Sequence, residues 1–388
     1  MKTQVKIMLF AILAILALFA GQSQAQNMGR YIVTIQGPVG NAVRGAGGQV
    51  IYEYSIIPAI AIEIPEAAVQ GLSRNPNVIR IEPDAEVWAL PNTPAGSTGK
   101  PTDKGKPKPP TPPSQKTPWG VVRIGADQAW TTFTGDGVKV AVLDTGIDTT
   151  HPDLVVWGGR NFINPRKSYK DDNGHGTHVA GIIAALNNDI GVVGVAPGAK
   201  LYAVKVLNAA GSGTIAGIIA GLEWCVNNEI DIVNMSLGTD SDIQAFHDAC
   251  DAAADSILLV AAAGNDGTAG DSVDYPAAYG SVIAVAATDT DNQRASWSSY
   301  GDGYNDAEGY DDEVDYAAPG VSIYSTYLGG GYATMSGTSM AAPHVAGTLA
   351  LMLEKGNDTI FITDLGSKDW DIYYGYGLVN AYRSVIGF

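Results

Sequence analysis

The chain has 388 residues, of which 46% are hydrophobic and 16% charged, so it fits a globular protein with room for two or three domains. Its formal net charge of −17 excludes nucleic acid and anionic membranes as favourable partners. From Thr117 onward only 12 Lys and Arg accompany 33 Asp and Glu. This acidity suits a soluble exported surface, bound cations or a salty habitat.

Residues 1–25 have the pattern of a secretion signal. Lys2 and Lys6 precede an apolar run of 14 residues, 7–20, and Ser23-Gln24-Ala25 offers small residues to a signal peptidase. Such a run is too short for an ordinary membrane span, which favours cleavage over anchoring. We expect a secreted, extracellular protein that has no stable membrane anchor after cleavage and acts as a monomer.

Residues 26–90 are expected to form a small α/β module with a thin core. Its expected elements are the strands Arg30–Ile35, Gln49–Ser55, Ala59–Ile64 and Val78–Ile81 and the helix Glu66–Arg74. Residues 91–114 are expected to be an extended linker, because Pro91–Pro113 contains eight prolines and four lysines. At roughly 3.1 Å per residue, such a segment spans about 70 Å.

Residues 115–388 alternate near-continuous apolar runs with amphipathic segments. The expected strands are Val138–Leu143, Leu201–Val206, Ile230–Met235, Ile257–Ala263 and Ser281–Ala287, and the expected helices include His178–Leu186, Thr214–Asn228 and Asp242–Ala254. This alternation predicts an α/β fold, with a doubly wound, mostly parallel sheet covered by helices on both faces. Functional residues are then expected at the C-terminal ends of the strands.

Ser339 stands out within Gly337-Thr338-Ser339-Met340-Ala341-Ala342-Pro343-His344, which leads from a Gly-rich turn into an apolar run. A serine at the start of a helix is held rigidly beside free backbone N–H groups, as a nucleophile should be. Serine is also an ordinary helix cap. The nucleophile interpretation therefore needs a base and a group that orients the base.

Earlier parts of the chain contain a candidate base, a candidate orienting group and a candidate oxyanion donor. Asp144 ends an expected strand, His175 lies on a Gly-rich entry to a helix, and Asn265 follows another strand. A carboxylate can orient and charge-compensate a histidine, and an amide can donate to an oxyanion, although Asp and Asn are also common turn residues. His175 and His178 have no accompanying carboxylate or Cys and make a poor zinc site, so no catalytic metal is expected.

In the order Asp, His, Asn, Ser, these motifs resemble those of the subtilisin-like serine endopeptidases (subtilases, peptidase S8), and the similarity covers Gln115–Phe388. The resemblance implies that Ser339 is the nucleophile, His175 the general base and acid, Asp144 its orienter and Asn265 an oxyanion donor. It implies hydrolysis of proteins and peptides with broad specificity through an acyl-enzyme. A catalytically silent peptide-binding homologue and a processing protease with one target are the alternatives.

The resemblance also implies a groove that holds an extended substrate as an added strand. The groove and its primary specificity pocket are expected at Gly211, Ser212, Gly213, Ser236, Leu237, Gly238 and Ala262–Gly264, with Asp274 at the pocket floor and Asp266 at its rim. A carboxylate at the floor favours Lys or Arg, whereas Leu90, which ends the first module, favours a large apolar group. Asp274 is alternatively a turn residue before Tyr275-Pro276, and mixed specificity is expected.

Structural calcium is implied in the same way, through oxygen ligands of the kind that a hard cation prefers. The tight site is expected at Gln115, Asp153, Leu186, Asn188, Ile190 and Val192. A second, weaker site is expected at Ala277, Tyr279, Val282, Glu313 and Asp315. The acidic stretch 302–315 departs from the simplest family pattern, either as a further calcium site or as a solvated loop.

Residues 26–90 resemble the family's inhibitory, ferredoxin-like propeptide (inhibitor I9 type), with a first helix cut short around Val39–Gly48. The resemblance implies a self-processing zymogen, in which the propeptide assists folding and then acts as an intramolecular inhibitor whose tail blocks the groove. The end point of maturation, between Leu90 and Gln115, stays open. So does a disulfide between Cys225 and Cys250, which export would permit.

Overall fold

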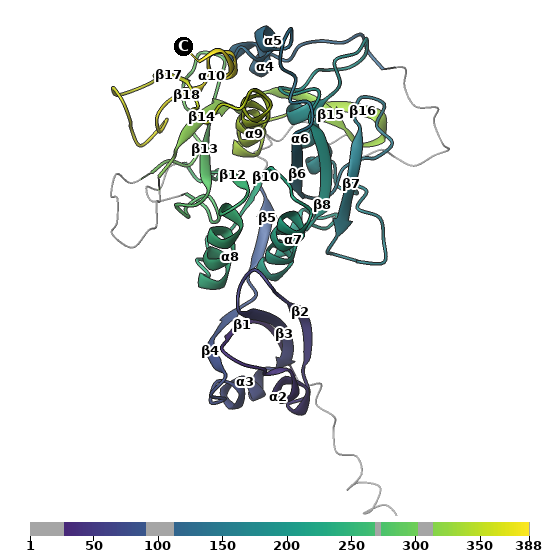
Figure 1. Cartoon of the computed structure of the whole chain (residues 1–388), viewed down its shortest axis with the longest axis vertical. Helices are drawn as coiled ribbons and strands as arrows, with labels where there is room; N and C mark the ends of the chain where they lie inside the picture. The colour runs from purple at the N-terminus through teal and green to yellow at the C-terminus, as the bar shows by residue number, and fades with distance from the viewer. Residues whose placement is uncertain (1–26, 91–111, 268–272, 302–312, 388) are drawn as a thin grey trace, which may run out of the picture. The chain divides into compact units, whose positions relative to one another are not determined.

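The computed structural model describes residues 27–90, 112–267, 273–301 and 313–387 (Figure 1). The chain divides into two compact units, Met1–Glu53 with Ile60–Pro83 and Tyr54–Ala59 with Asp84–Phe388. The predicted signal sequence, nearly all of the predicted linker and most of the acidic stretch lie outside the described residues. Within the described ranges, no helix combines the length and apolar character that crossing a membrane requires.

The first unit is a four-stranded sheet with the strand order β2-β3-β1-β4 and two short helices. Its elements are β1 (Met28–Ile35), α2 (Gly40–Gly45), β2 (Gln49–Glu53), β3 (Ala59–Pro65), α3 (Glu66–Leu72) and β4 (Val78–Pro83). Its core consists of Val33, Val39, Val43, Ile60, Ile62, Ile64 and Leu72. The six residues of α2 fall in the region where the sequence predicts a shortened helix.

The second unit is organised around a nine-stranded sheet with the order β17-β18-β14-β13-β12-β10-β6-β8-β7. Its strands are β6 (Lys139–Asp144), β7 (Val156–Asn161), β8 (Lys200–Lys205), β10 (Ile232–Met235), β12 (Leu258–Ala262), β13 (Ile283–Thr288), β14 (Tyr316–Pro319), β17 (Ile362–Thr363) and β18 (Leu378–Val379). The strands from β18 to β7 pair in parallel, and β17 pairs antiparallel with β18.

Helices cover both faces of this sheet. In Figure 1, α6 and α9 lie on one face and α7 and α8 on the other. The helices of the unit are α4 (Trp119–Arg123), α5 (Ala126–Ala129), α6 (His175–Ala184), α7 (Ile215–Asn227), α8 (Gln244–Ala254), α9 (Thr338–Lys355), α10 (Ala381–Ile386) and the 3₁₀ turn η1 (Leu328–Gly330). The central strands are buried along nearly their whole length, as their apolar sequences require. The predicted doubly wound α/β fold is confirmed.

Two smaller sheets complete the second unit. One has the order β11-β5-β9, formed by β5 (Glu86–Ala89), β9 (Ser212–Thr214) and β11 (Leu237–Gly238). The other is a hairpin of β15 (Ile323–Tyr327) and β16 (Gly331–Met335), which precedes α9. Residues 84–90, including β5, therefore belong to this second unit and not to the small unit that precedes them in the sequence.

Candidate active site

Asp144 and His175 form a buried pair. Asp144 is the last residue of β6 and His175 the first of α6, so the C-terminal end of a parallel strand faces a helix N-terminus. His175 Nδ1 lies 2.8 Å from both carboxylate oxygens of Asp144. His175 Nε2 is buried and has no hydrogen-bond partner in the described part of the chain. A proton on Nδ1 therefore leaves the Nε2 lone pair free to accept another.

The start of α6 is fixed by the residues just before His175. Gly174 has φ 114°, and a Cβ there would lie 2.4 Å from the ring of Tyr327. Asn173 Oδ1 accepts the backbone N–H of His175 at 3.1 Å. The helix consequently begins three residues before the predicted His178, because an Asn side chain and a left-handed Gly start it before the apolar periodicity begins.

Ser339 is the second residue of α9 and is buried. Its Oγ donates to the carbonyl of Ser236 at 3.0 Å, and Ser236 Oγ donates back to the carbonyl of Ser339 at 2.8 Å. Because Nε2 of His175 has no partner in the described residues, the contact between Ser339 and His175 that the assigned roles require is not formed in this conformation. The hydroxyl proton is held by the Ser236 carbonyl instead.

Asn265 is held so that its amide N–H groups point at a carbonyl. Its Oδ1 accepts from Thr338 N at 3.0 Å and from Thr338 Oγ1 at 3.1 Å, while Nδ2 donates to the carbonyl oxygen of Leu90 at 2.6 Å. Since the oxygen is occupied by donors, the NH₂ group is committed to Leu90. Sequence reasoning missed Thr338, because its place beside Ser339 does not show which side chain it contacts.

Residues 86–90 run as a strand between the two segments predicted to line a groove. β5 pairs antiparallel with β9 on one side and with β11 on the other. Ala89 N donates to the carbonyl of Gly211 at 2.9 Å, and Leu90 N to that of Ser236 at 3.4 Å. Val87 is fully buried and Trp88 is 46% exposed, as expected for alternating side chains of an added strand. The segments 211–213 and 236–238 thus hold a peptide in extended form.

Asp274 lies where the side chain of Leu90 ends. A Cβ on Gly238 would meet Leu90 Cδ1 at 2.9 Å and Asp274 Oδ2 at 2.8 Å, and a Cβ on Gly264 would lie 2.9 Å from the same oxygen. The two glycines therefore leave room for this carboxylate. Burial, with the nearby charges of Asp266 and Asp240, raises the pKa of Asp274 to about 7. Ala262 is buried in β12 on the approach to Gly264.

Several residues of the first predicted calcium site come together. Asp153 is buried and accepts from Asn188 Nδ2 at 2.9 Å, from Val192 N at 2.9 Å and from Tyr332 OH at 3.1 Å. Gln115 Oε1 accepts from Asn188 N at 2.5 Å. Burial raises the pKa of Asp153. Asn188 Oδ1 accepts from Ile190 N at 2.8 Å, so the side-chain oxygens of this group already accept hydrogen bonds within the chain. They are of the oxygen types that calcium prefers, and ligation by them and by the carbonyls of Leu186, Ile190 and Val192 stays a prediction.

Two of the residues of the second predicted cation site already accept hydrogen bonds within the chain. The carbonyl of Tyr279 accepts from Val282 N at 2.8 Å, and Asp315 Oδ2 accepts from Ala284 N at 2.8 Å. Ala277 and Glu313 are buried. Over the described ranges, no cluster of three or more His, Cys, Asp or Glu is suited to a metal. Each predicted calcium site has at most two carboxylates and needs amide or carbonyl oxygens as its other ligands.

His178, Cys225 and Cys250 are buried in the fold. His178 Nε2 lies 3.1 Å from the carbonyls of both Ile323 and Ala333, so it joins α6 to the β15–β16 hairpin, and burial lowers its pKa to about 3. Cys225 and Cys250 are buried, free thiols, so the disulfide that the sequence left open is not formed. Burial raises the pKa of both.

Comparison with known proteins gives one consistent result. Residues 135–366 match the subtilase family, Peptidase S8. The chain is 44% identical to an alkaline protease of Alkalihalobacillus alcalophilus, over 86% of this chain and 80% of that protein. It is 41% identical to a thermostable alkaline protease of Halalkalibacterium halodurans, over 99% of both. It is 49% identical to subtilisin Savinase of Lederbergia lenta, over 69% of this chain and 98% of that protein. The chain therefore belongs to the subtilase family and is a serine endopeptidase with a subtilisin-like fold.

Proposed function

We propose that this protein is a secreted endopeptidase made as a self-processing zymogen, with Asp144, His175 and Ser339 as its catalytic triad. The observation that carries the proposal is the position of Leu90. Its carbonyl oxygen lies 2.6 Å from Asn265 Nδ2, at the end of a strand held on both sides by backbone pairing. That is how the acyl side of a cleaved or cleavable bond would lie.

In the proposed reaction, rotation about the Cα–Cβ bond of Ser339 moves its hydroxyl from the Ser236 carbonyl to His175 Nε2. His175 takes the hydroxyl proton as Oγ attacks the carbonyl carbon, and Asp144 stabilises the imidazolium through Nδ1. Asn265 Nδ2 and the backbone N–H of Ser339 hold the oxyanion. His175 then gives the proton to the leaving nitrogen, and water hydrolyses the acyl-enzyme by the same steps.

Residues 26–90 act in this proposal as an inhibitory propeptide whose last residues occupy the groove. Residues 1–25 would direct export. Cleavage after Leu90 would release the nitrogen of Pro91, which has no N–H in the intact chain and gains one from His175 as the bond breaks. N-terminal sequencing of the first cleavage product and of the mature protein locates the first cut and the final N-terminus. Hydrolysis of a Val-Trp-Ala-Leu p-nitroanilide, abolished by Ser339→Ala, tests the proposed activity as a whole.

The side chain before the scissile bond is proposed to be large and apolar, or Lys and Arg when Asp274 is ionised. Since the pKa of Asp274 is about 7, its carboxylate is neutral well below pH 7 and charged well above it. The ratio of kcat/KM for a Lys substrate to that for a Leu substrate should therefore rise between about pH 6 and pH 8. Asp274→Ser should lower cleavage after Lys by about tenfold, or roughly 1.4 kcal/mol, and remove the pH dependence of the ratio.

The matched control for Asp274 is Asp255→Ser, an exposed acid at the end of α8 that should leave the ratio unchanged. Both variants and the wild type are profiled on a peptide library at several pH values. Equal losses for Lys and Leu substrates in Asp274→Ser would mean that this carboxylate is structural and the pocket simply apolar.

Calcium is proposed to stabilise the fold through Gln115, Asp153 and Asn188 without entering the chemistry. Binding to the native state alone adds stability, about 2.7 kcal/mol at a hundredfold excess over Kd. Chelation should therefore shorten the half-life of thermal inactivation by about tenfold or more while the initial turnover rate stays the same.

Asp153→Asn should show the short half-life with calcium present, whereas Asp189→Asn, an exposed change in the same loop, should not. Equal half-lives with and without chelator would show that these residues do not hold a stabilising calcium ion.

A further inference from the structure

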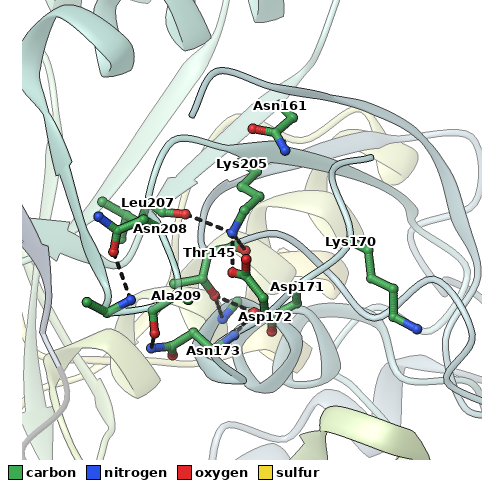
Figure 2. Close-up of polar contacts among 12 residues, drawn as sticks. Thr145, Asn161, Lys170, Asp171, Asp172, Asn173, Lys205, Leu207, Asn208 and Ala209 are labelled. Carbon is green, nitrogen blue, oxygen red and sulfur yellow. Dashed lines mark hydrogen bonds and ion pairs between the residues drawn. The ribbon is translucent and has the colours of Figure 1, made fainter. Parts of the chain in front are cut away.

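Lys205 is a buried lysine whose ammonium group donates three hydrogen bonds. It ends β8, in register with Asp144 at the end of β6, and its side chain is only 3% exposed. Its Nζ lies 2.6 Å from the carbonyl of Thr145, 2.6 Å from Asp172 Oδ1 and 2.9 Å from the carbonyl of Leu207. An ammonium group has three donors, so these acceptors satisfy it completely. Figure 2 shows the amine among these acceptors, while the side chain of Lys170 points away from them.

The three acceptors belong to three segments of the candidate site. Thr145 directly follows Asp144, and Asp172 lies in the loop that leads to His175. Leu207 begins the turn that leads to Gly211, whose carbonyl accepts from the strand held in the groove. One cation therefore joins the carboxylate strand, the histidine loop and one edge of the groove.

A second set of hydrogen bonds closes the same connection. Asp171 Oδ1 accepts from Thr145 Oγ1 at 2.8 Å and from the backbone N–H groups of Asn173 and Gly174 at 2.9 and 3.0 Å. Asn173 Nδ2 donates to the carbonyl of Ala209 at 3.1 Å. The loop before His175 is thus tied both to the end of β6 and to the groove edge, and it cannot shift without breaking bonds to one of them.

Stability alone gives little reason to bury a charge here. Moving an ammonium out of water is costly, and replacing a whole buried ion pair by apolar side chains is often neutral or stabilising. Its partner Asp172 is 54% exposed, so that carboxylate would be solvated without Lys205. What the ammonium supplies, and an apolar chain does not, is three directional bonds between segments that must keep a common geometry.

We propose that Lys205 is a positioning residue that couples the groove edge 207–211 to the Asp144–His175 pair, so that a peptide bound along β9 holds the histidine loop in its reacting position. The inference rests on the catalytic roles proposed above for Asp144 and His175. It predicts that binding energy from residues remote from the scissile bond raises kcat, as catalysis by remote binding requires, and that this gain depends on Lys205.

The test compares acetyl-Leu p-nitroanilide with acetyl-Val-Trp-Ala-Leu p-nitroanilide, which carries residues 87–90. Active sites are counted with a serine-directed sulfonyl fluoride, so that rates refer to folded enzyme. In Lys205→Met and in Asp172→Ala, the ratio of kcat on the long substrate to kcat on the short one should fall about tenfold, since small displacements of catalytic groups cost up to a hundredfold. Asp172→Asn keeps the acceptor oxygen and should restore most of the ratio.

Lys170→Met is the matched control, because it removes the same charge from the loop that carries Asp172 without touching the three acceptors of Lys205. Lys170 pairs with Asp148 at 3.1 Å instead, and its variant should keep the wild-type ratio. An unchanged ratio in Lys205→Met overturns the positioning role. If Lys205→Met does not fold, Asp172→Ala decides alone. Ser339→Ala measured in parallel tests the proposed function separately, since activity in that variant would overturn the triad and not the coupling alone.

Discussion

Ser339→Ala is expected to lower kcat by about 10⁶-fold and to leave the precursor as one uncleaved chain. The size of the loss is that known for the nucleophile of subtilisin, a member of the same family, and is carried over from it. The reason is that attack on the carbonyl needs a nucleophilic Oγ, which Ser339 is proposed to supply, and its neighbour Thr338 holds the amide of Asn265 that contacts the Leu90 carbonyl. Gel analysis of the purified precursor over time, with turnover of a peptide anilide, measures both parts of the result.

The control for that variant is Ser336→Ala, which makes the same change three residues earlier. Ser336 Oγ accepts from Ser322 N at 2.9 Å and has no proposed part in the reaction, so this variant should mature and turn over normally. His175→Ala should be nearly as inactive as Ser339→Ala, and combining the two should add little, because the residues act as a unit. A purified Ser339→Ala protein that still matures would contradict self-processing.

Asn265→Ala is expected to lower kcat by about 10² to 10³, or roughly 3 to 4 kcal/mol, with little change in KM. This magnitude is also that of the corresponding donor in subtilisin itself. Nδ2 of Asn265 already reaches the Leu90 carbonyl oxygen at 2.6 Å, and its bond should strengthen as that oxygen gains charge. Thr338→Val removes one of the two donors that orient the amide and should cause a smaller loss in kcat.

Steady-state kinetics on an anilide substrate measures these losses. Asn164→Ala is the control, since Asn164 Oδ1 accepts a backbone N–H in a loop of its own, from Arg166 at 3.2 Å. A turnover rate for Asn265→Ala equal to that of the wild type would remove this amide from the mechanism. A rise in KM with an unchanged kcat would make it a substrate-binding group only.

Most of the sheet could be predicted because its strands are buried on both faces. Continuous apolar runs located β6, β8, β10, β12 and β13 to within a few residues. β7 was missed because its sequence, Val-Trp-Gly-Gly-Arg-Asn, has two glycines and no apolar run. The short strands β9 and β11 were recognised only as groove segments, since they pair with β5 and not with the main sheet.

The candidate site was predictable to the extent that residue types and strand ends determine it. Asp144 and Asn265 were expected at strand ends, and parallel pairing brings such ends to one edge of the sheet. Which acceptor a hydroxyl or an ammonium selects depends on backbone atoms far away in the sequence. The bond from Ser339 to the Ser236 carbonyl, the support of Asn265 by Thr338 and the three bonds of Lys205 therefore had no sequence signal strong enough to be predicted.

The central claim is that Ser339 is the nucleophile, and covalent labelling tests it most directly. Mature protein is inactivated with phenylmethanesulfonyl fluoride, digested with another protease and mapped by mass spectrometry. If Ser339 is the nucleophile, each inactivated molecule carries one sulfonyl group on Ser339, activity falls in proportion to labelling, and Ser339→Ala takes up no label. Complete inactivation with Ser339 unmodified, or a label on another residue, would contradict it.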